Sequence, residues 1–167
     1  MTRRGRISLA GLLRRKLLGA MRRLARFRLG PEERLRGEVT VAGGTWRVEI
    51  AMTPRRRYVG LGGRDRLDEG AGMLFLYPDA AVRKFSMRGC LIPLDIAFLS
   101  PSLEVVSLCT MAVEPDRVGR VQYISAAPAR YVLETPAGEL ARAGVVVGSK
   151  AVLAGVPAAI WSSEGVG

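Results

Sequence analysis

Apolar and polar residues change their spacing once along this chain, close to residue 37. Before residue 30, apolar side chains recur every three or four positions, which is the period of an amphipathic helix. Beyond residue 37 they alternate with polar ones, and residues 46–50 read Trp-Arg-Val-Glu-Ile. The pattern therefore predicts an N-terminal helix, ended by Gly30-Pro31, in front of a β domain.

Six later segments also have the composition of β-strands. They are Met73–Tyr77, Val82–Met87, Leu94–Leu99, Leu103–Met111, Arg130–Glu134 and Ala151–Leu153. With the strands before residue 52, the predicted number comes to about eight. Many short strands with helices only as inserts predict a mostly β fold, a compact antiparallel β barrel or jelly-roll-like sandwich.

Two short helices and one hairpin turn are predicted between these strands. Thr53-Pro54 and Thr135-Pro136 each begin a helix, because Thr caps a first turn and Pro fits inside it. Gly62-Gly63 and Gly144 end the two helices, and Ser100-Pro101-Ser102 forms the turn. We divide the chain into a basic helix (1–30), a linker (31–36), a β domain (37–154) and a C-terminal tail (155–167).

The positive charge is concentrated in the N-terminal segment. The chain has 26 Lys and Arg residues against 15 Asp and Glu residues, a formal net charge of +11. Ten of the 26 basic residues lie in the first thirty positions, with no acid among them, so 16 remain against all 15 acids. Any electrostatic partner is therefore expected to meet the N-terminal segment and not the nearly neutral β domain.

The predicted N-terminal helix is suited to a surface. Residues expected to contact a membrane or a partner are Leu9, Leu13, Leu17, Leu24 and Phe27 on its apolar face, and Arg15, Arg22 and Arg26 on its basic face. Three interpretations of this segment remain open. It docks on an anionic membrane surface, it docks on a protein partner, or it results from a start codon assigned too early. Nucleic acid is disfavoured, because no base-reading context accompanies the helix.

The N-terminal segment is not a convincing secretory signal. Arg14-Arg15-Lys16 interrupts the expected apolar core of a signal, and no stretch reaches the ~20 apolar residues that span a bilayer. We expect a cytoplasmic protein, or one at the cytoplasmic face of the membrane; export with an atypical signal is the alternative.

The residues available for chemistry are few. The absence of histidine removes Ser-His-Asp and Cys-His nucleophilic machinery and multi-histidine zinc sites. Cys90 and Cys109 match no zinc or thioredoxin spacing, so both are expected to be free thiols. The acidic pairs in the sequence lack the loop pattern of a calcium site. We therefore predict no metal and no cofactor.

Asp95 is the most unusual side chain, since it lies in the apolar run Leu-Ile-Pro-Leu-Asp-Ile-Ala-Phe-Leu. A buried carboxyl must find donors or stay protonated. The predicted turn places it opposite Val106 or Ser107, and Arg57 and Arg64 are candidate partners. It is either a ligand-binding carboxylate or a structural acid that binds backbone N–H groups.

Cys90 is a further candidate ligand-binding residue. It follows Gly89 in a predicted bend, where a neighbouring Arg88 could lower the thiol pKa. Without histidine the thiol has no obvious base, so nucleophilic catalysis is disfavoured.

A series of short blocks resembles the domain of unknown function 192 family. The blocks, in order, are Thr53-Pro54, Gly60-Leu61, Gly72–Phe75, Phe85 with Met87, Ile92–Ile96, Ala129–Glu134 and Ala137-Gly138. The resemblance implies a compact β barrel or jelly-roll-like sandwich and no established activity, substrate or cofactor. It also marks departures, since the family usually has Trp at Ser86, Asn at Gly89, Thr or a similar residue at Cys90, and Arg-Gly-Leu-Met at 59–62.

Together these observations predict a non-enzymatic binding or accessory module, held at a membrane surface or partner by its basic N-terminal helix. The alternative is a small-ligand receptor or enzyme with a pocket near Asp95, Arg57 and Arg64, using carboxylate acid–base chemistry.

Overall fold

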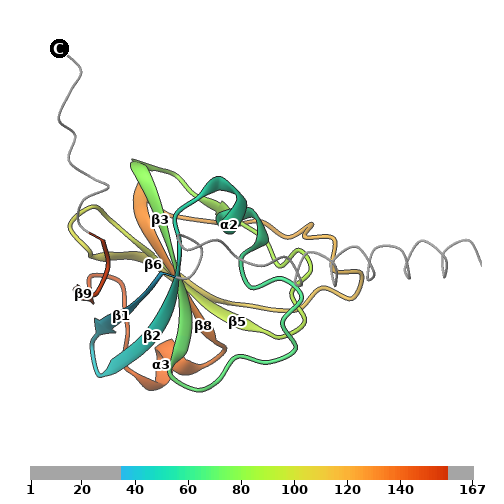
Figure 1. The fold of residues 1–167 in the computed structure, drawn as a ribbon, viewed down its shortest axis with the longest axis horizontal. Coiled ribbons are helices and arrows are strands. Elements are labelled where there is room, and N and C mark those ends of the chain that lie inside the picture. The colour runs from blue at the N-terminus through green and yellow to red at the C-terminus, as the bar shows by residue number, and fades with distance from the viewer. Residues whose placement is uncertain (1–34, 158–167) are drawn as a thin grey trace, which may run out of the picture.

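The computed structural model describes residues 35–157 of the 167-residue chain (Figure 1). The predicted N-terminal helix, most of the predicted linker and most of the predicted tail lie outside the described residues. Strand β1 begins at Arg36 and the last strand, β9, ends at Ala154.

The described chain is mostly β, with two short helices, as predicted. The strands are β1 (Arg36–Val41), β2 (Gly44–Ala51), β3 (Ala71–Ala81), β4 (Lys84–Phe85), β5 (Leu94–Leu99), β6 (Val105–Met111), β7 (Tyr123–Ile124), β8 (Ala129–Pro136) and β9 (Ala151–Ala154). The helices are α2 (Pro54–Val59) and α3 (Glu139–Arg142).

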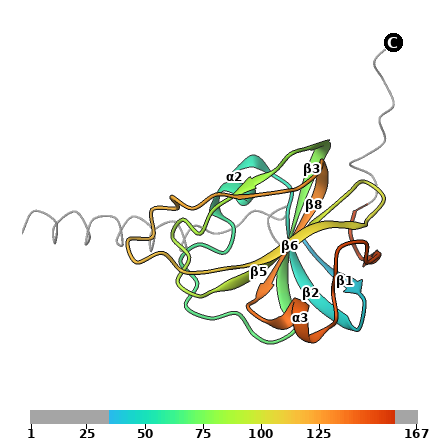
Figure 2. The same ribbon diagram turned by 180° about the vertical axis from the view of Figure 1, so that it is seen from behind.

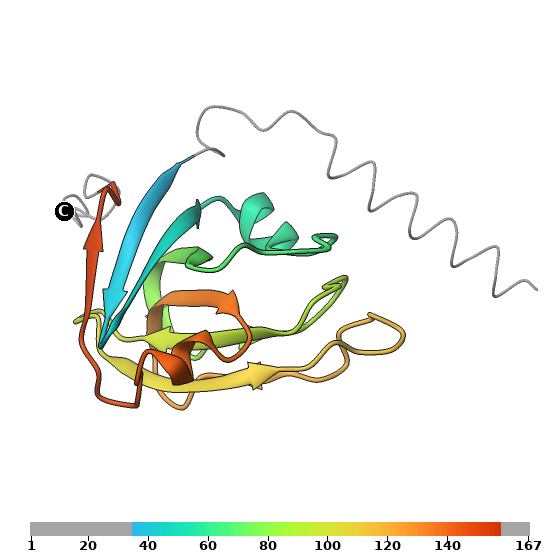
Figure 3. The same cartoon turned by 90° about the horizontal axis from the view of Figure 1, so that it is seen from below.

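Seven of the strands form one curled sheet in the order β6-β5-β8-β3-β2-β1-β9, and β4 pairs with β7 beside it. Figures 1 and 2 show its strands radiating from a common centre, as expected of a strongly twisted sheet. At one end the start of β6 contacts the segment just before β9, since Val105 N donates to Ser149 O at 2.9 Å and Gly148 N donates to Val105 O at 2.8 Å. Figure 3 shows the strands curving about one interior, and the fold is a curled half-barrel.

The prediction of an all-antiparallel sheet is wrong at one place. Strands β2 and β3 are parallel, with Val48 opposite Gly72 and Ile50 opposite Leu74. The chain leaves β2 through α2 and residues 60–70 before β3 begins, and a connection of this length returns it to the same end of the sheet. Two of the family blocks, Thr53-Pro54 and Gly60-Leu61, lie within this crossover, and the next block, Gly72–Phe75, lies on β3.

The first predicted helix begins where the sequence indicates. The Thr53 side chain accepts a hydrogen bond from Arg56 N at 3.1 Å, and Pro54 occupies the first turn. The predicted start of the second helix is wrong, because Thr135 and Pro136 still belong to β8 and pair with Asp95 and Leu94. Helix α3 begins only after Gly138, once the chain has left the sheet.

The sheet carries a hydrophobic core on each face, because alternate residues of its strands point to opposite sides. On β3, Leu74 and Leu76 join one core, which α3 covers with Leu140. Met73 and Phe75 join the other, which contains Leu61 and Met87 from two loops together with Cys90. Figure 1 shows α2 and α3 on opposite sides of the centre of the sheet. The loops over the second core form the candidate site.

Candidate functional site

Asp95 is an enclosed structural acid. Its side chain accepts hydrogen bonds from Thr110 Oγ1 at 2.6 Å and from the backbone N of Leu140 at 3.1 Å, and the residue is 3% exposed. Its partner across the hairpin is Thr110, so the predicted pairing with Val106 or Ser107 is wrong. The turn is longer than predicted, with Leu99 opposite Val105, and the register shifts between Phe98 and Leu99. Asp95 therefore ties β5 to α3.

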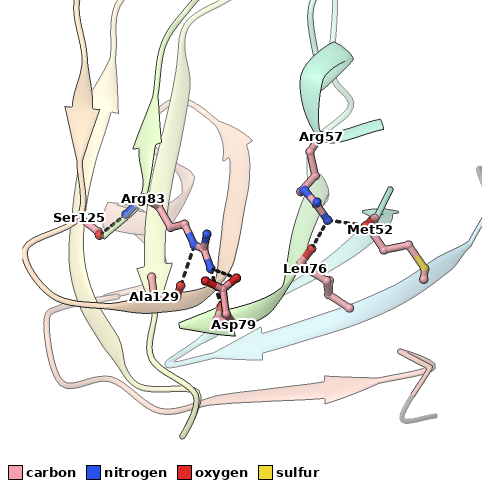
Figure 4. A network of polar contacts seen from close by, with 7 residues as sticks. All are labelled: Met52, Arg57, Leu76, Asp79, Arg83, Ser125 and Ala129. Carbon is pink, nitrogen blue, oxygen red and sulfur yellow. Dashed lines mark hydrogen bonds and ion pairs between the residues drawn. The ribbon is translucent and has the colours of Figure 1, made fainter. Parts of the chain in front are cut away.

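Arg57 lies in a different network, which holds the irregular end of β3 (Figure 4). Its guanidinium donates to the carbonyl oxygens of Met52 and of Leu76, the latter at 2.9 Å, and lies 4.7 Å from the centre of the Tyr77 ring. Arg83 lies 3.8 Å from the same ring centre and donates to Ala129 O at 2.9 Å. Arg57 thus joins the end of β2 to β3.

Arg64 forms a two-pronged ion pair with Glu49, with both N···O distances at 2.7 Å, and Arg56 also pairs with this carboxylate. Burial raises the pKa of Glu49, but the hydrogen bond and charge of Arg64 and the charge of Arg56 outweigh it, so the net pKa is lowered. The structure therefore gives Asp95, Arg57 and Arg64 separate partners, and of the three only Arg64 lines the groove described next.

Arg64 also lines an open groove of about 670 Å³ across β1, β2 and the start of β3. Its charged side chains nearly balance, and all are half-buried or exposed: Arg36, Arg47, Arg64 and Arg66 against Glu38, Glu49 and Asp68. Such groups are solvated or paired, so the groove gives no strong reason to bind a particular chemistry.

A smaller hollow of about 100 Å³ lies over the second core, between the end of α2 and the loop before β5. Its lining residues are Tyr58, Val59, Gly60, Leu61, Gly62, Ser86, Arg88, Cys90 and Glu134. Gly63 N donates to Gly89 O at 2.9 Å, which ties the two loops together, and Arg56 Nη1 donates to Gly60 O at 3.2 Å. The walls of the hollow are therefore held by one backbone hydrogen bond and one from a buried arginine side chain.

Glu134 of β8 forms the side of the hollow that belongs to the sheet. It lies opposite Met73 of β3 and Ile96 of β5, both fully buried, and is itself 5% exposed. Burial alone raises the pKa of its carboxyl to about 8, and no hydrogen bond or ion pair from residues 35–157 offsets it. At neutral pH this carboxyl is mostly protonated.

Cys90 faces the same hollow. The pKa of its thiol is raised to about 12, first by burial and then by the charge of Glu134, while Arg88 has a smaller opposing effect. The net shift is opposite to the activation by Arg88 that the sequence suggests, so the thiol stays protonated and unreactive. Cys90 and Cys109 are both free thiols, as predicted.

Arg88 brings a fixed positive charge to the rim. Its Nη2 donates to Tyr58 O at 2.9 Å, and its guanidinium lies 3.8 Å from the centre of the Tyr58 ring. The side chain is exposed, and Tyr58 is 66% exposed. The hollow therefore has a neutral carboxyl at its base and a guanidinium at its mouth.

The burial of Glu134 could have been suspected from the sequence, but the predicted strand ends too early to indicate it. The predicted strand Arg130–Glu134 ends on this residue, where an acid is expected to be exposed. In the structure β8 continues to Pro136, so Glu134 lies inside the strand and on the same face as the buried Val132. Glu134 follows the apolar residues Tyr131–Leu133 but is followed by Thr135-Pro136, so its signal is weaker than that of Asp95, which has apolar residues on both sides.

Two further findings concern the described residues alone. Residues 35–157 contain no group of three or more His, Cys, Asp or Glu side chains that could hold a metal ion. Within the same range, no helix has the length and apolar character needed to cross a membrane.

Fold and site together define a curled β half-barrel domain with one small carboxyl-bearing hollow. The chain belongs to the DUF192 family, described as "Uncharacterized ACR", whose match covers residues 37–153. Ser86 and Cys90, two positions at which this chain departs from the residues expected from that resemblance, both line the hollow. These two departures from the family pattern therefore lie in the wall of the candidate site.

Two solved structures are similar to this chain. A protein of unknown function from Novosphingobium aromaticivorans shares 33% identity over 69% of this chain and 83% of its own, with a TM-score of 0.64. A Sinorhizobium meliloti protein described as a "putative transcription regulator" shares 26% identity over 76% of this chain and 100% of its own, with a TM-score of 0.68. A comparison with curated proteins finds no match.

Proposed function

We propose that this domain is a small-ligand-binding module whose site is the hollow over Glu134. One observation carries the proposal: a carboxyl that is 5% exposed lines a hollow and has no hydrogen-bond or ionic partner among residues 35–157. Burial disfavours the ionised form of this carboxyl, which faces the hollow without a protein partner among the described residues. A ligand group that pairs with it offsets this effect, whereas a merely structural acid would be paired as Asp95 is.

The size of the hollow limits what can enter it. Liquid water occupies about 30 Å³ per molecule, so a hollow of about 100 Å³ accepts only a group of a few non-hydrogen atoms. The ligand is therefore a very small molecule or the end of a larger one. Binding is favoured over catalysis, because the Cys90 thiol stays protonated and the chain has no histidine.

The test is a binding screen by nuclear magnetic resonance on the full chain labelled with ¹⁵N. Four probes cover the main chemistries: acetamide (neutral), propionate (anionic), ethylammonium (cationic) and β-alanine (zwitterionic). We expect at least one probe to shift the backbone amides of Gly60, Gly62 and Cys90 at concentrations up to about 10 mM. The same probe should bind Glu134→Gln about tenfold more weakly, because the substitution removes the carboxyl.

The exposed acid Glu69 provides the matched control. Glu69→Gln makes the same chemical change outside the hollow and should leave the affinity unchanged. The proposal fails if no probe shifts these amides, or if Glu134→Gln and Glu69→Gln bind every probe equally.

A second proposal concerns residues 1–30, which lie outside the described residues. We propose that they hold the protein at an anionic membrane surface. The support is their ten basic residues without a single acid, together with the predicted apolar face. A protein partner for the same segment is the competing occupant.

Vesicle flotation of the full chain tests this second proposal. Each basic residue near an anionic surface contributes up to about 1 kcal/mol, so the triple change Arg15→Glu, Arg22→Glu, Arg26→Glu should weaken binding to phosphatidylserine vesicles about a hundredfold or more. The control reverses three exposed charges of the β domain, Arg47, Arg66 and Arg117, and should float like the wild type. Equal flotation of the two triple variants would exclude a membrane role for the segment.

A further inference from the structure

Two groups of opposite character line the hollow without touching each other. Glu134 lies on the sheet side and Arg88 at the mouth, and both influence the thiol of Cys90 between the loops, in opposite directions. Yet within residues 35–157 no ion pair joins Arg88 to Glu134. The hollow therefore contains one carboxyl and one guanidinium that do not form an ion pair with each other.

The position of Arg88 explains why it does not turn inward. Its guanidinium donates to Tyr58 O at 2.9 Å and lies over the Tyr58 ring at 3.8 Å, so both a hydrogen bond and a cation–π contact hold it at the rim. Only one of its five N–H donors is used by that carbonyl, since the guanidinium is a planar fork. The remaining donors are available to an anion at the mouth.

We propose that the hollow binds a compact amino carboxylate, with the ammonium group directed to Glu134 and the carboxylate held by Arg88. This inference rests on the proposed function and specifies its ligand. A guanidinium matches a carboxylate with two parallel hydrogen bonds, and a carboxylate of Glu134 is the natural counter-ion of an ammonium group. A simple cation would be repelled by Arg88, and a simple anion could accept a hydrogen bond from the protonated Glu134 but would form no ion pair with it.

The protons balance in the binding step. Before binding, the Glu134 carboxyl is mostly protonated, since burial raises its pKa to about 8. The groups that face or influence it are Tyr58 of α2, Arg88 and Cys90 of the loop before β5, and Tyr77 of β3, while β5 presents Ile96. When the ammonium group arrives, the carboxyl loses its proton to solvent and becomes the anion of the pair. At pH 7 we expect about 0.9 proton to be released per ligand.

The experiment titrates the full chain with glycine, β-alanine and γ-aminobutyrate at pH 7, because the spacing between the two charges selects one of them. Propionate and ethylammonium are the matched probes that each lack one charge. We expect the best amino carboxylate to bind about tenfold more tightly than either of them. Calorimetry in two buffers with different ionisation enthalpies should show the proton release.

Two variants and two controls assign the contacts. Glu134→Gln should lose the proton release and about tenfold in affinity, and Arg88→Met should lose about tenfold in affinity while keeping the proton release. Glu69→Gln and Arg47→Met change exposed groups outside the hollow and should behave like the wild type.

The inference is overturned if none of the three amino carboxylates binds more tightly than propionate and ethylammonium, or if Arg88→Met leaves the affinity unchanged. In that event the proposed function still stands if acetamide, propionate or ethylammonium shifts the amides of Gly60, Gly62 and Cys90 in a manner that depends on Glu134. The proposed function fails together with the inference when no probe shifts these amides, or when Glu134→Gln and Glu69→Gln bind every probe equally.

Discussion

Glu134→Gln is expected to remove most of the fall in the free energy of unfolding between about pH 5 and pH 8. The pKa of Glu134 is raised from 4.5 to about 8 in the folded state, so in this window the folded protein keeps a proton that the unfolded chain releases. The wild type therefore loses stability as the pH rises, with a slope of up to about 1.4 kcal/mol per pH unit. Gln resembles the protonated carboxyl in shape and does not titrate.

The measurement is urea unfolding, followed by circular dichroism, of the full chain at several pH values from 5 to 8. The free energy of unfolding of Glu134→Gln should be larger than that of the wild type. The difference should grow with pH and reach on the order of 3–4 kcal/mol at pH 8. The lowered pKa values of Glu49 and Glu114 act at more acidic pH, where stability is lost as these groups become protonated. Glu49 and Glu114 therefore contribute little to the change in stability between pH 5 and pH 8.

Glu69→Gln again serves as the control, because Glu69 is exposed, and its pH profile should follow that of the wild type. Parallel profiles for the wild type and Glu134→Gln would show that the carboxyl of Glu134 is not held protonated by burial. The main support for a ligand-binding role would then be lost.

Asp95→Ala should lower the free energy of unfolding by about 3 kcal/mol, the second-largest effect that we predict. The substitution leaves the backbone N–H of the buried Leu140 and the hydroxyl of Thr110 without their acceptor. Asp95→Asn keeps one carbonyl oxygen in the same place and should cost only about 1 kcal/mol. The difference between the two variants measures the role of Asp95 as an acceptor that fixes α3 to β5.

The same urea assay checks this prediction, with Asp68→Ala, a change of an exposed acid, as the control. A second measurement separates structure from function: Asp95→Asn should bind β-alanine, or the best probe of the screen, as the wild type does. Loss of that binding in a well-folded Asp95→Asn variant would return Asp95 to the binding site. Equal stability of Asp95→Ala and the wild type would contradict its structural role.

Much of the local structure could be predicted from the sequence, because its causes lie within a few residues. The Thr53-Pro54 start of α2 depends on one side-chain cap and one constrained residue, and both act locally. The alternation in 46–50 predicts β2 because neighbouring side chains of a strand face opposite sides. The resemblance to DUF192 rests on blocks that the match over 37–153 confirms.

The site could be predicted only in part. Cys90 was a candidate and does line the hollow, whereas Asp95, Arg57 and Arg64 have separate partners. Whether a strand acid is exposed or enclosed depends on what covers it. For Glu134 the cover comes from loops more than forty residues earlier in the chain.

The sequence by itself determined the mostly β class, the start of α2, the separation of charge between residues 1–30 and the rest, and the family. Only the tertiary structure decided the parallel pairing of β2 with β3, the register that encloses Asp95, and the hollow that encloses Glu134. The physical reason is the sequence separation over which each interaction acts. Periodicity, caps and charge act between near neighbours, whereas register and burial depend on which distant segments share a face of the sheet.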